Sequence, residues 1–288
     1  MDYNLCDYKT ITAVMKKHGF SFSKALGQNF IIDSGVCPEM VRALGADLKT
    51  GVIEIGPGIG VLTKELCKSA GRVVAVELDK RLPEILGETL ADYDNVEIVS
   101  GDAMKIDLNA LIKEKFAGMQ SVKICANLPY YITSPVIMAL LEKQINVDEI
   151  VVMVQKEAAQ RLCAPVGSRE AGAVTAAVNY RAESEILFEV GRESFMPAPK
   201  VDSAVIRLKV RKEKEIAVKN EKQFFSVIKA AFSQRRKTAV NSISNGLGLK
   251  KEKVCAVFEA LNIEQSIRSE KLTLENFKNI AEEIYGKE

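Results

Sequence analysis

The segment VIEIGPGIG, residues 52–60, decides the fold because it joins a strand to a helix through a glycine-rich turn. Residues 52–55 are mostly β-branched, and a helical pattern follows at 61–69. The glycines at 56, 58 and 60 permit a tight turn and let a ligand lie against bare backbone. Because Val61 stands where the fingerprint GxGxxG requires its last glycine, we do not expect this turn to bind a pyrophosphate.

Strands and helices alternate along the chain beyond this turn. Strands are expected at 73–76, 96–99, 122–126 and 150–154, with helices between them at 80–90, 108–116 and 135–142. Helices are also expected at 10–18 and 34–44, and β-rich runs at 186–190 and 204–210 favour an antiparallel edge. The alternation predicts an α/β fold with a Rossmann-like, mostly parallel sheet and helices on both faces.

The β-rich pattern stops after residue 212. Helical patterns then follow at 224–232, 238–247, 251–261 and 274–284. The charged segment 211–219 between the two parts lacks strong apolar periodicity. We therefore predict an α/β domain over residues 1–211 and a small all-α domain over residues 212–288.

Composition restricts the chemistry that the chain can perform. It has 288 residues, and His18 is its only histidine. Its six cysteines are scattered and form no CxxC pair, so we predict no metal site and no histidine-dependent catalysis. Unpaired thiols are typical of a reducing compartment, and we expect the cytoplasm. The start of the chain has no signal-peptide pattern, and no apolar run approaches ~18 residues, so we expect no membrane partner.

Polar side chains follow successive predicted strands. Glu77 ends the strand after the glycine turn, 21 residues beyond Gly56, and Asp102 follows the next strand. An acid at this spacing suits the hydroxyls of a ribose. Asp102 is suited to accept a hydrogen bond from an adenine amino group, and Gly58 lets a ligand approach the backbone. Each residue alone is compatible with an ordinary loop. Together they predict a nucleoside site without phosphates, and S-adenosyl-L-methionine as the cofactor.

The segment Asn127-Leu128-Pro129-Tyr130 follows a fourth predicted strand, and its residue types suit neither a strand nor a helix. It suits a base pocket for methylation of an adenine N6, whose lone pair is delocalised into the ring. The side-chain oxygen of Asn127 and the backbone oxygen of Leu128 can accept the two N6 protons, and Tyr130 offers a flat face for stacking. A proline-containing turn with a core tyrosine is the alternative interpretation.

Basic residues are concentrated near the predicted boundary between the domains. From Arg207 to Lys237 the chain has eleven Lys or Arg and three acids, although its overall net charge is only +2. Arg235, Arg236 and Lys237 cannot share one helix face, because neighbours differ by ~100°. We interpret them as a cluster at a helix junction that binds RNA phosphates, and a solvated junction is the alternative.

The chain resembles the small-subunit (16S) ribosomal RNA adenine N6,N6-dimethyltransferases, whose loss gives kasugamycin resistance. Eight segments carry the resemblance, in order: KALGQNFIID from Lys24, IEIGPGIGVLT from Ile53, AVELD from Ala75, GDA from Gly101, NLPYYITSP from Asn127, MVQKEAAQRL from Met153, SFMPAPKVDSAVIRL from Ser194 and FSQRRKT from Phe232.

The resemblance implies a methyltransferase domain and a helical RNA-binding domain. It implies dimethylation of two adjacent adenosines in the 3′-terminal hairpin loop of small-subunit rRNA, within a pre-assembled subunit late in its biogenesis. It adds Asn29 and Ile31 to the cofactor contacts at Gly56, Glu77, Asp102 and Asn127, and Phe195 as an aromatic that stacks on the target base. We expect a monomer, although the sequence does not determine the oligomeric state.

Three other functions are open at this point. A large-subunit rRNA adenine methylase of macrolide resistance shares the cofactor motifs and an Asn-x-Pro-Tyr segment. The KVDSAVIRL segment from Lys200 and the size of the helical domain argue against it. A catalytically silent assembly factor would not need all of the cofactor motifs, and a DNA adenine methylase is the third alternative.

Overall fold

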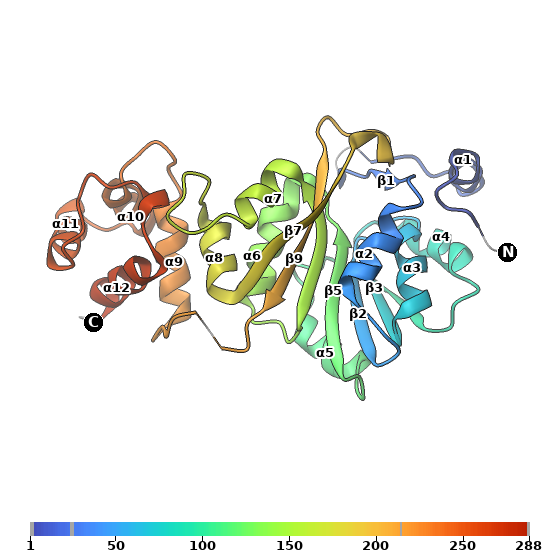
Figure 1. Ribbon diagram of the computed structural model, residues 1–288, viewed down its shortest axis with the longest axis horizontal. Helices are drawn as coiled ribbons and strands as arrows, with labels where there is room; N and C mark the ends of the chain where they lie inside the picture. Colours follow the sequence, from blue (N-terminus) through green and yellow to red (C-terminus); the bar gives the residue numbers. More distant parts are fainter. Residues whose placement is uncertain (1–2, 24–25, 214, 287–288) are drawn as a thin grey trace. The chain divides into compact units, whose positions relative to one another are not determined.

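The computed structural model describes residues 3–23, 26–213 and 215–286, so the first two residues of the KALGQNFIID segment lie outside the described residues. The chain forms two compact units (Figure 1). The first contains residues 1–159 and 184–210, and the second contains residues 160–183 and 211–288.

The first unit is built on a seven-stranded sheet in the order β4-β3-β2-β5-β6-β9-β7 (Figure 1). Its strands are β2 (Thr50–Ile55), β3 (Arg72–Glu77), β4 (Val96–Ser100), β5 (Ser121–Asn127), β6 (Glu149–Gln155), β7 (Ala182–Val190) and β9 (Ser203–Val210). Strands β4, β3, β2, β5 and β6 are parallel, and β9 pairs antiparallel with β6, as the sequence predicts. The chain runs outward from β2 to β4 and then returns to β5, so the strand order reverses between β2 and β5. Open α/β sheets bind ligands at the carboxyl ends of the strands at such a point.

Helices surround this sheet. They are α1 (Tyr8–Lys17), α2 (Val36–Leu44), α3 (Val61–Ser69), α4 (Leu82–Thr89), α5 (Leu108–Lys115) and α6 (Thr133–Glu142), with the 3₁₀ turns η2 (Tyr130–Ile132) and η3 (Arg192–Ser194). Strand β2 is buried along its whole length, which suits Val52, Ile53 and Ile55, and its Glu54 is a buried acid. Two short strands, β1 (Phe30–Ile31) and β8 (Phe195–Met196), pair outside the main sheet.

The second unit is helical. It contains α8 (Ala173–Arg181), α9 (Glu221–Ala231), α10 (Ala239–Leu247), α11 (Lys251–Ala260), η4 (Ser269–Lys271) and α12 (Leu274–Tyr285), while α7 (Lys156–Leu162) begins in the first unit. The Tyr180 ring is fully buried and lies 4.9 Å from the ring of Phe224 on α9. Its hydroxyl donates to Glu221 at 2.7 Å, and Arg181 pairs with the same carboxylate. These contacts join residues 160–183 to the C-terminal helices.

The division at residues 210 and 211 lies where the sequence analysis expects a boundary, but residues 160–183 group with the second unit and not with the first. Helices α7 and α8 are also absent from the predicted elements. Helix α8 is buried on nearly every side, so its sequence lacks the amphipathic stripe that marks a surface helix. No helix within the described ranges is long and apolar enough to cross a membrane.

Candidate active site

Four neighbouring strands bring the predicted polar residues to one edge of the sheet. The register pairs Ile55 with Val76 on one side and with Ala126 on the other. Gly56, Glu77 and Asn127 therefore lie side by side at the carboxyl ends of β2, β3 and β5. Strand β4 pairs Ser100 with Glu77, which places the following Asp102 at the same edge.

In the glycine turn, the space in the Cβ direction is empty at Gly56 and occupied at Gly58. Both residues have left-handed backbones, with φ of +71° and +59°. A Cβ atom on Gly56 would meet nothing within 4 Å, whereas one on Gly58 would lie 3.1 Å from Cε1 of Phe30. From the sequence we expect a ligand in the space beside Gly58. In the structure a phenylalanine ring fills the Cβ direction of Gly58, and the bare backbone faces open space at Gly56.

Backbone donors hold the Glu77 carboxylate at this edge. Its two oxygens accept from Asp79 N at 2.7 Å and from Gly58 N at 3.3 Å. Burial raises the pKa of Glu77, and these hydrogen bonds oppose the rise. The carboxylate thus links the glycine turn to the end of β3.

Asp79 connects this loop to the segment before β1. Arg81 binds its carboxylate at 2.9 and 2.6 Å and holds the pKa of Asp79 at about 2. Gln28 Nε2 donates to Asp79 at 2.9 Å, so the residue before Asn29 is anchored to the β3–α4 loop. Gln28 and Asp79 are not among the site residues that the sequence predicts.

The half-buried Asp102 uses one carboxylate oxygen within its own loop, where Oδ1 accepts from Met104 N at 3.0 Å. The other oxygen lies 3.7 Å from Lys105 Nζ. The first bond fixes the orientation of the carboxylate at the end of β4.

Asn127 and Leu128 present two acceptors at the end of β5. Asn127 Nδ2 donates to Asn29 O at 3.2 Å, which orients the side-chain amide. Its Oδ1 accepts no hydrogen bond from any residue that the structure describes. Leu128 N donates to Met153 O at 3.1 Å, while the Leu128 carbonyl accepts nothing from the described backbone. Neither oxygen has a hydrogen-bond donor among the described residues, although Leu128 as a whole residue is only 1% exposed.

The two predicted stacking residues lie in different environments. Tyr130 is half-buried, and its hydroxyl is 2.7 Å from Ser203 Oγ, which ties the segment after β5 to β9. Phe195 is 3% exposed and lies opposite Ile31, itself 2% exposed, in the β1–β8 ladder. The pairing joins two predicted site residues, but it leaves little of the Phe195 ring accessible to a base. Stacking by Phe195 stays a prediction.

Arg235, Arg236 and Lys237 lie in the second unit, at the junction of α9 and α10. They line a cavity of about 290 Å³ together with Arg169 and Arg268, which come from two other segments of this unit. All five side chains are exposed. Within the parts of the chain that the structure describes, none of the five makes an ion pair or a side-chain hydrogen bond.

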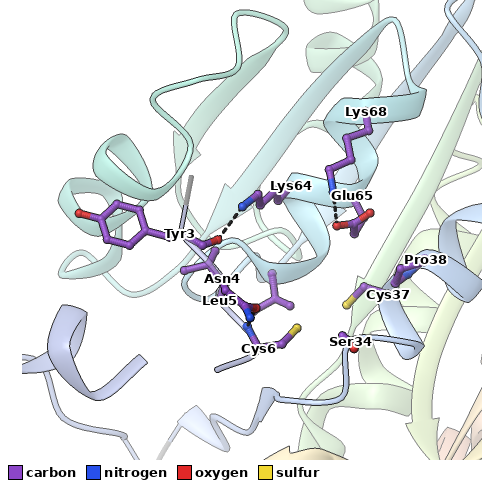
Figure 2. Close-up of a pocket in the computed structure, with 11 residues that line it drawn as sticks. Tyr3, Asn4, Leu5, Cys6, Ser34, Cys37, Pro38, Lys64, Glu65 and Lys68 are labelled. Atoms are coloured by element: carbon purple, nitrogen blue, oxygen red, sulfur yellow. Dashed lines mark hydrogen bonds and ion pairs between the residues drawn. The ribbon is translucent and has the colours of Figure 1, made fainter. Parts of the chain in front are cut away.

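A second cavity, of about 230 Å³, lies between the N-terminal segment and helices α2 and α3 and contains none of the predicted site residues (Figure 2). Figure 2 shows Lys64 reaching the Tyr3 carbonyl, at 2.6 Å, and Lys68 turned to Glu65, also at 2.6 Å. Its charged groups therefore bind within the protein.

Comparison with known proteins places this geometry in a family. The family model described as Ribosomal RNA adenine dimethylase matches residues 19–285. A protein of Geobacillus thermodenitrificans named Ribosomal RNA small subunit methyltransferase A is 46% identical over 271 residues, which cover 93% of this chain and 92% of that protein. The protein of the same name from Clostridioides difficile is 44% identical, with 98% of each chain covered.

Solved structures agree with this comparison. A dimethyladenosine transferase from Plasmodium falciparum superposes with a TM-score of 0.68 at 25% identity, covering 87% of this chain and 95% of that one. The 23S rRNA methyltransferase ErmE superposes with a TM-score of 0.60 at 24% identity, covering 88% and 98%, which shows a shared fold. The match to the family model over nearly the whole chain and the identity to the small-subunit enzymes show that this chain belongs to the ribosomal RNA adenine dimethylase family.

Proposed function

We propose that the protein transfers methyl groups from S-adenosyl-L-methionine to N6 of two adjacent adenosines in the 3′-terminal hairpin loop of 16S rRNA, giving N6,N6-dimethyladenosine. The observation that carries the proposal is a pair of acceptors at the end of β5 that have no donor among the described residues, Asn127 Oδ1 and the Leu128 carbonyl. An adenine amino group has two N–H donors, and these acceptors match them. The protein would act on a pre-assembled small subunit, late in its biogenesis.

The acceptors assist the reaction by binding the amino group as its charge rises. When N6 takes a methyl group, its lone pair leaves conjugation with the ring and its protons become more acidic. Asn127 Oδ1 and the Leu128 carbonyl then form stronger hydrogen bonds than in the ground state, which lowers the barrier. Pro129 limits the backbone after Leu128 and so helps to keep the direction of its carbonyl. Each transfer also releases one N6 proton, which passes to water because the two acceptor oxygens are too weakly basic to keep it. One N–H therefore remains to be held for the second transfer.

The residues at the strand ends fit the methyl donor. When bound, S-adenosylmethionine supplies an electrophilic methyl group on a positively charged sulfur. The open backbone at Gly56 admits a ligand, and the Glu77 carboxylate is suited to accept from the ribose hydroxyls. Asp102 would accept from the adenine amino group of the donor. Leu78, 50% exposed beside Glu77, offers apolar surface to the purine ring.

The test of this function is methyl transfer to isolated subunits. Wild-type protein is incubated with methyl-labelled donor and undermethylated small or large subunits, and the labelled nucleotides are mapped. We expect dimethylation of two adjacent adenosines near the 3′ end of 16S rRNA. Label confined to 23S rRNA would contradict the proposal. Absence of donor binding in calorimetry would favour a silent assembly factor.

Glu77→Ala is expected to weaken donor binding by about 1–3 kcal/mol, the range for lost hydrogen bonds to a charged group. Calorimetry with S-adenosylmethionine measures the change. Glu114→Ala is the matched control, because Glu114 is an exposed acid whose one ion pair among the described residues is with its neighbour Lys115. Equal donor affinity in the two variants would remove Glu77 from the donor site.

The basic cavity of the second unit is the proposed contact for RNA phosphates. Five cations from three segments surround it, and Glu270 is the one acid among the lining residues that the structure describes. Arginines without protein partners are suited to bind phosphate oxygens through two parallel hydrogen bonds. The cavity supports a role for Arg235, Arg236 and Lys237 in binding rRNA and adds Arg169 and Arg268 to that group.

Replacing Arg235, Arg236 and Lys237 together by Ala is expected to weaken small-subunit binding and to leave donor affinity unchanged. Each lost phosphate contact should flatten the slope of log K against log salt by ~0.7–0.9. The nucleotide that is methylated should not change, because phosphate contacts position and do not specify. Binding is measured at several salt concentrations.

The control for this triple variant is Ala replacement of Lys250, Lys251 and Lys253. These three lysines are exposed, belong to the same unit and do not line the cavity. Their replacement therefore removes the same amount of charge from another part of the unit. Equal slopes for the two triple variants would show that the cavity has no particular role in RNA binding.

A further inference from the structure

Tyr131 is an exposed aromatic side chain beside the candidate active site. It is 56% exposed and belongs to η2, directly after the segment that carries Asn127 and Leu128. Its hydroxyl makes no hydrogen bond with the residues described by the structure. Tyr130 and Phe195 differ, because the first is bonded to Ser203 and the second is buried. Tyr131 therefore offers the most accessible ring among the three aromatics.

The Tyr131 ring is supported by backbone. Gly27 has a left-handed backbone, with φ of +60°. A Cβ atom on it would lie 3.2 and 3.3 Å from Cε1 and Cδ1 of Tyr131, and 3.4 Å from Cβ of Pro129. The absence of a side chain at Gly27 lets the ring pack closely against this segment. A ring held in this way loses little conformational freedom when a ligand stacks on it.

A short chain of contacts connects the ring to the reacting position. Asn29 Nδ2 donates to Gly27 O at 3.1 Å, and Asn127 Nδ2 donates to Asn29 O at 3.2 Å. Single exposed apolar side chains are common on protein surfaces and need no explanation. Tyr131 differs because this loop binds the residue that holds the proposed target amino group. The ring thus packs against the loop that binds Asn127, which we call the rim of the proposed adenine pocket.

Binding of the proposed substrate would be favoured by an aromatic surface at this rim. Two adjacent adenosines are modified, and each must leave its stack to bring N6 to Asn127. The flanking base then loses a stacking neighbour. We propose that the Tyr131 ring stacks on the purine that flanks the target adenosine and so positions the RNA strand for both transfers. This inference rests on the proposed function.

The test compares three variants in methylation of undermethylated small subunits. Tyr131→Ala is expected to raise KM for the subunit by roughly five- to 150-fold, the range for one lost base–aromatic contact. Tyr131→Leu should raise KM nearly as much although leucine is apolar, and Tyr131→Phe should give the wild-type KM because it keeps the ring. Calorimetry should give the wild-type donor affinity for all three variants.

A direct measurement of stacking uses an RNA stem–loop with 2-aminopurine in place of the flanking adenosine. Binding of wild-type protein and of Tyr131→Phe should quench its fluorescence, and Tyr131→Ala should quench it less. Tyr8→Ala removes a similarly exposed tyrosine, 62% exposed on α1, and should behave as wild type. Wild-type KM and quenching in Tyr131→Ala would overturn the inference. The proposed function would stand in that case, because it fails only if wild-type protein does not methylate the small subunit.

Discussion

Replacing Asn127 by Ala is expected to lower kcat by about 10²–10³-fold, the cost of removing one preorganised hydrogen-bonding group from an active site. The open Oδ1 of Asn127 is one of two acceptors for the N6 protons of the target adenine. Its partner, the Leu128 carbonyl, belongs to the backbone and remains in the variant. The loss should therefore appear in single-turnover rates with saturating subunit and donor. Donor affinity should fall as well if Asn127 also contacts the donor, as the resemblance implies.

The matched control is Asn95→Ala. Asn95 Nδ2 donates to the carbonyls of Cys67 and Ala70, both at 2.9 Å, and takes no part in the proposed site. This variant should lower the free energy of unfolding and leave kcat close to that of wild type. A wild-type kcat for Asn127→Ala would mean that Asn127-Leu128-Pro129-Tyr130 serves only as a turn.

The sheet could be predicted because each of its strands is marked by a short pattern of neighbouring residues. β-branched runs of four or five residues, each followed by a glycine or a polar residue, mark buried parallel strands and their carboxyl ends. The edge that collects Gly56, Glu77, Asp102 and Asn127 follows from the parallel direction of the strands alone. Residues on that edge were therefore accessible to sequence reasoning without knowledge of any side-chain contact.

Contacts between distant segments could not be predicted in this way. Asn29 precedes the first strand of the sheet, and only the tertiary fold brings its carbonyl to Asn127. The pairing of Ile31 with Phe195 also depends on two short strands outside the main sheet. The support of Tyr131 by Gly27 is a contact of the same kind. Each requires a loop path that periodicity does not specify.

Charge counted along the chain differs from charge at the surface. Arg207 and Arg211 contribute to the basic run, yet Arg207 pairs with Glu149 and Glu185, and Arg211 pairs with Glu183. The acids come from neighbouring strands and lie far from these arginines in sequence. The cations that remain without such partners, among the described residues, include Arg235, Arg236 and Lys237. Arg207 and Arg211 are therefore neutralised within the protein, whereas Arg235, Arg236 and Lys237 keep their charge available for RNA.

Gly58→Val is expected to weaken donor binding by more than about 100-fold, because the valine would strain the backbone and would also crowd the Phe30 ring. Valine is strained at a φ of +59°, and its Cβ would lie 3.1 Å from the Phe30 ring. The turn must shift, which moves Gly58 N away from Glu77 Oε2. Misplacing the carboxylate costs about 1–3 kcal/mol, and distortion of the neighbouring backbone at Gly56 adds to it. Calorimetry with S-adenosylmethionine measures the loss.

The matched control for this prediction is Gly118→Val. Gly118 also has a left-handed backbone, with φ of +88°, but a Cβ atom there would meet nothing within 4 Å. It lies between α5 and β5, at the start of that strand and away from its carboxyl end. The two variants share the backbone strain of about 1–2 kcal/mol, so both should lose stability in denaturant unfolding. Only Gly58→Val should lose affinity for the methyl donor. Equal donor affinity in the two variants would mean that the glycine turn is needed for folding and does not form the donor site.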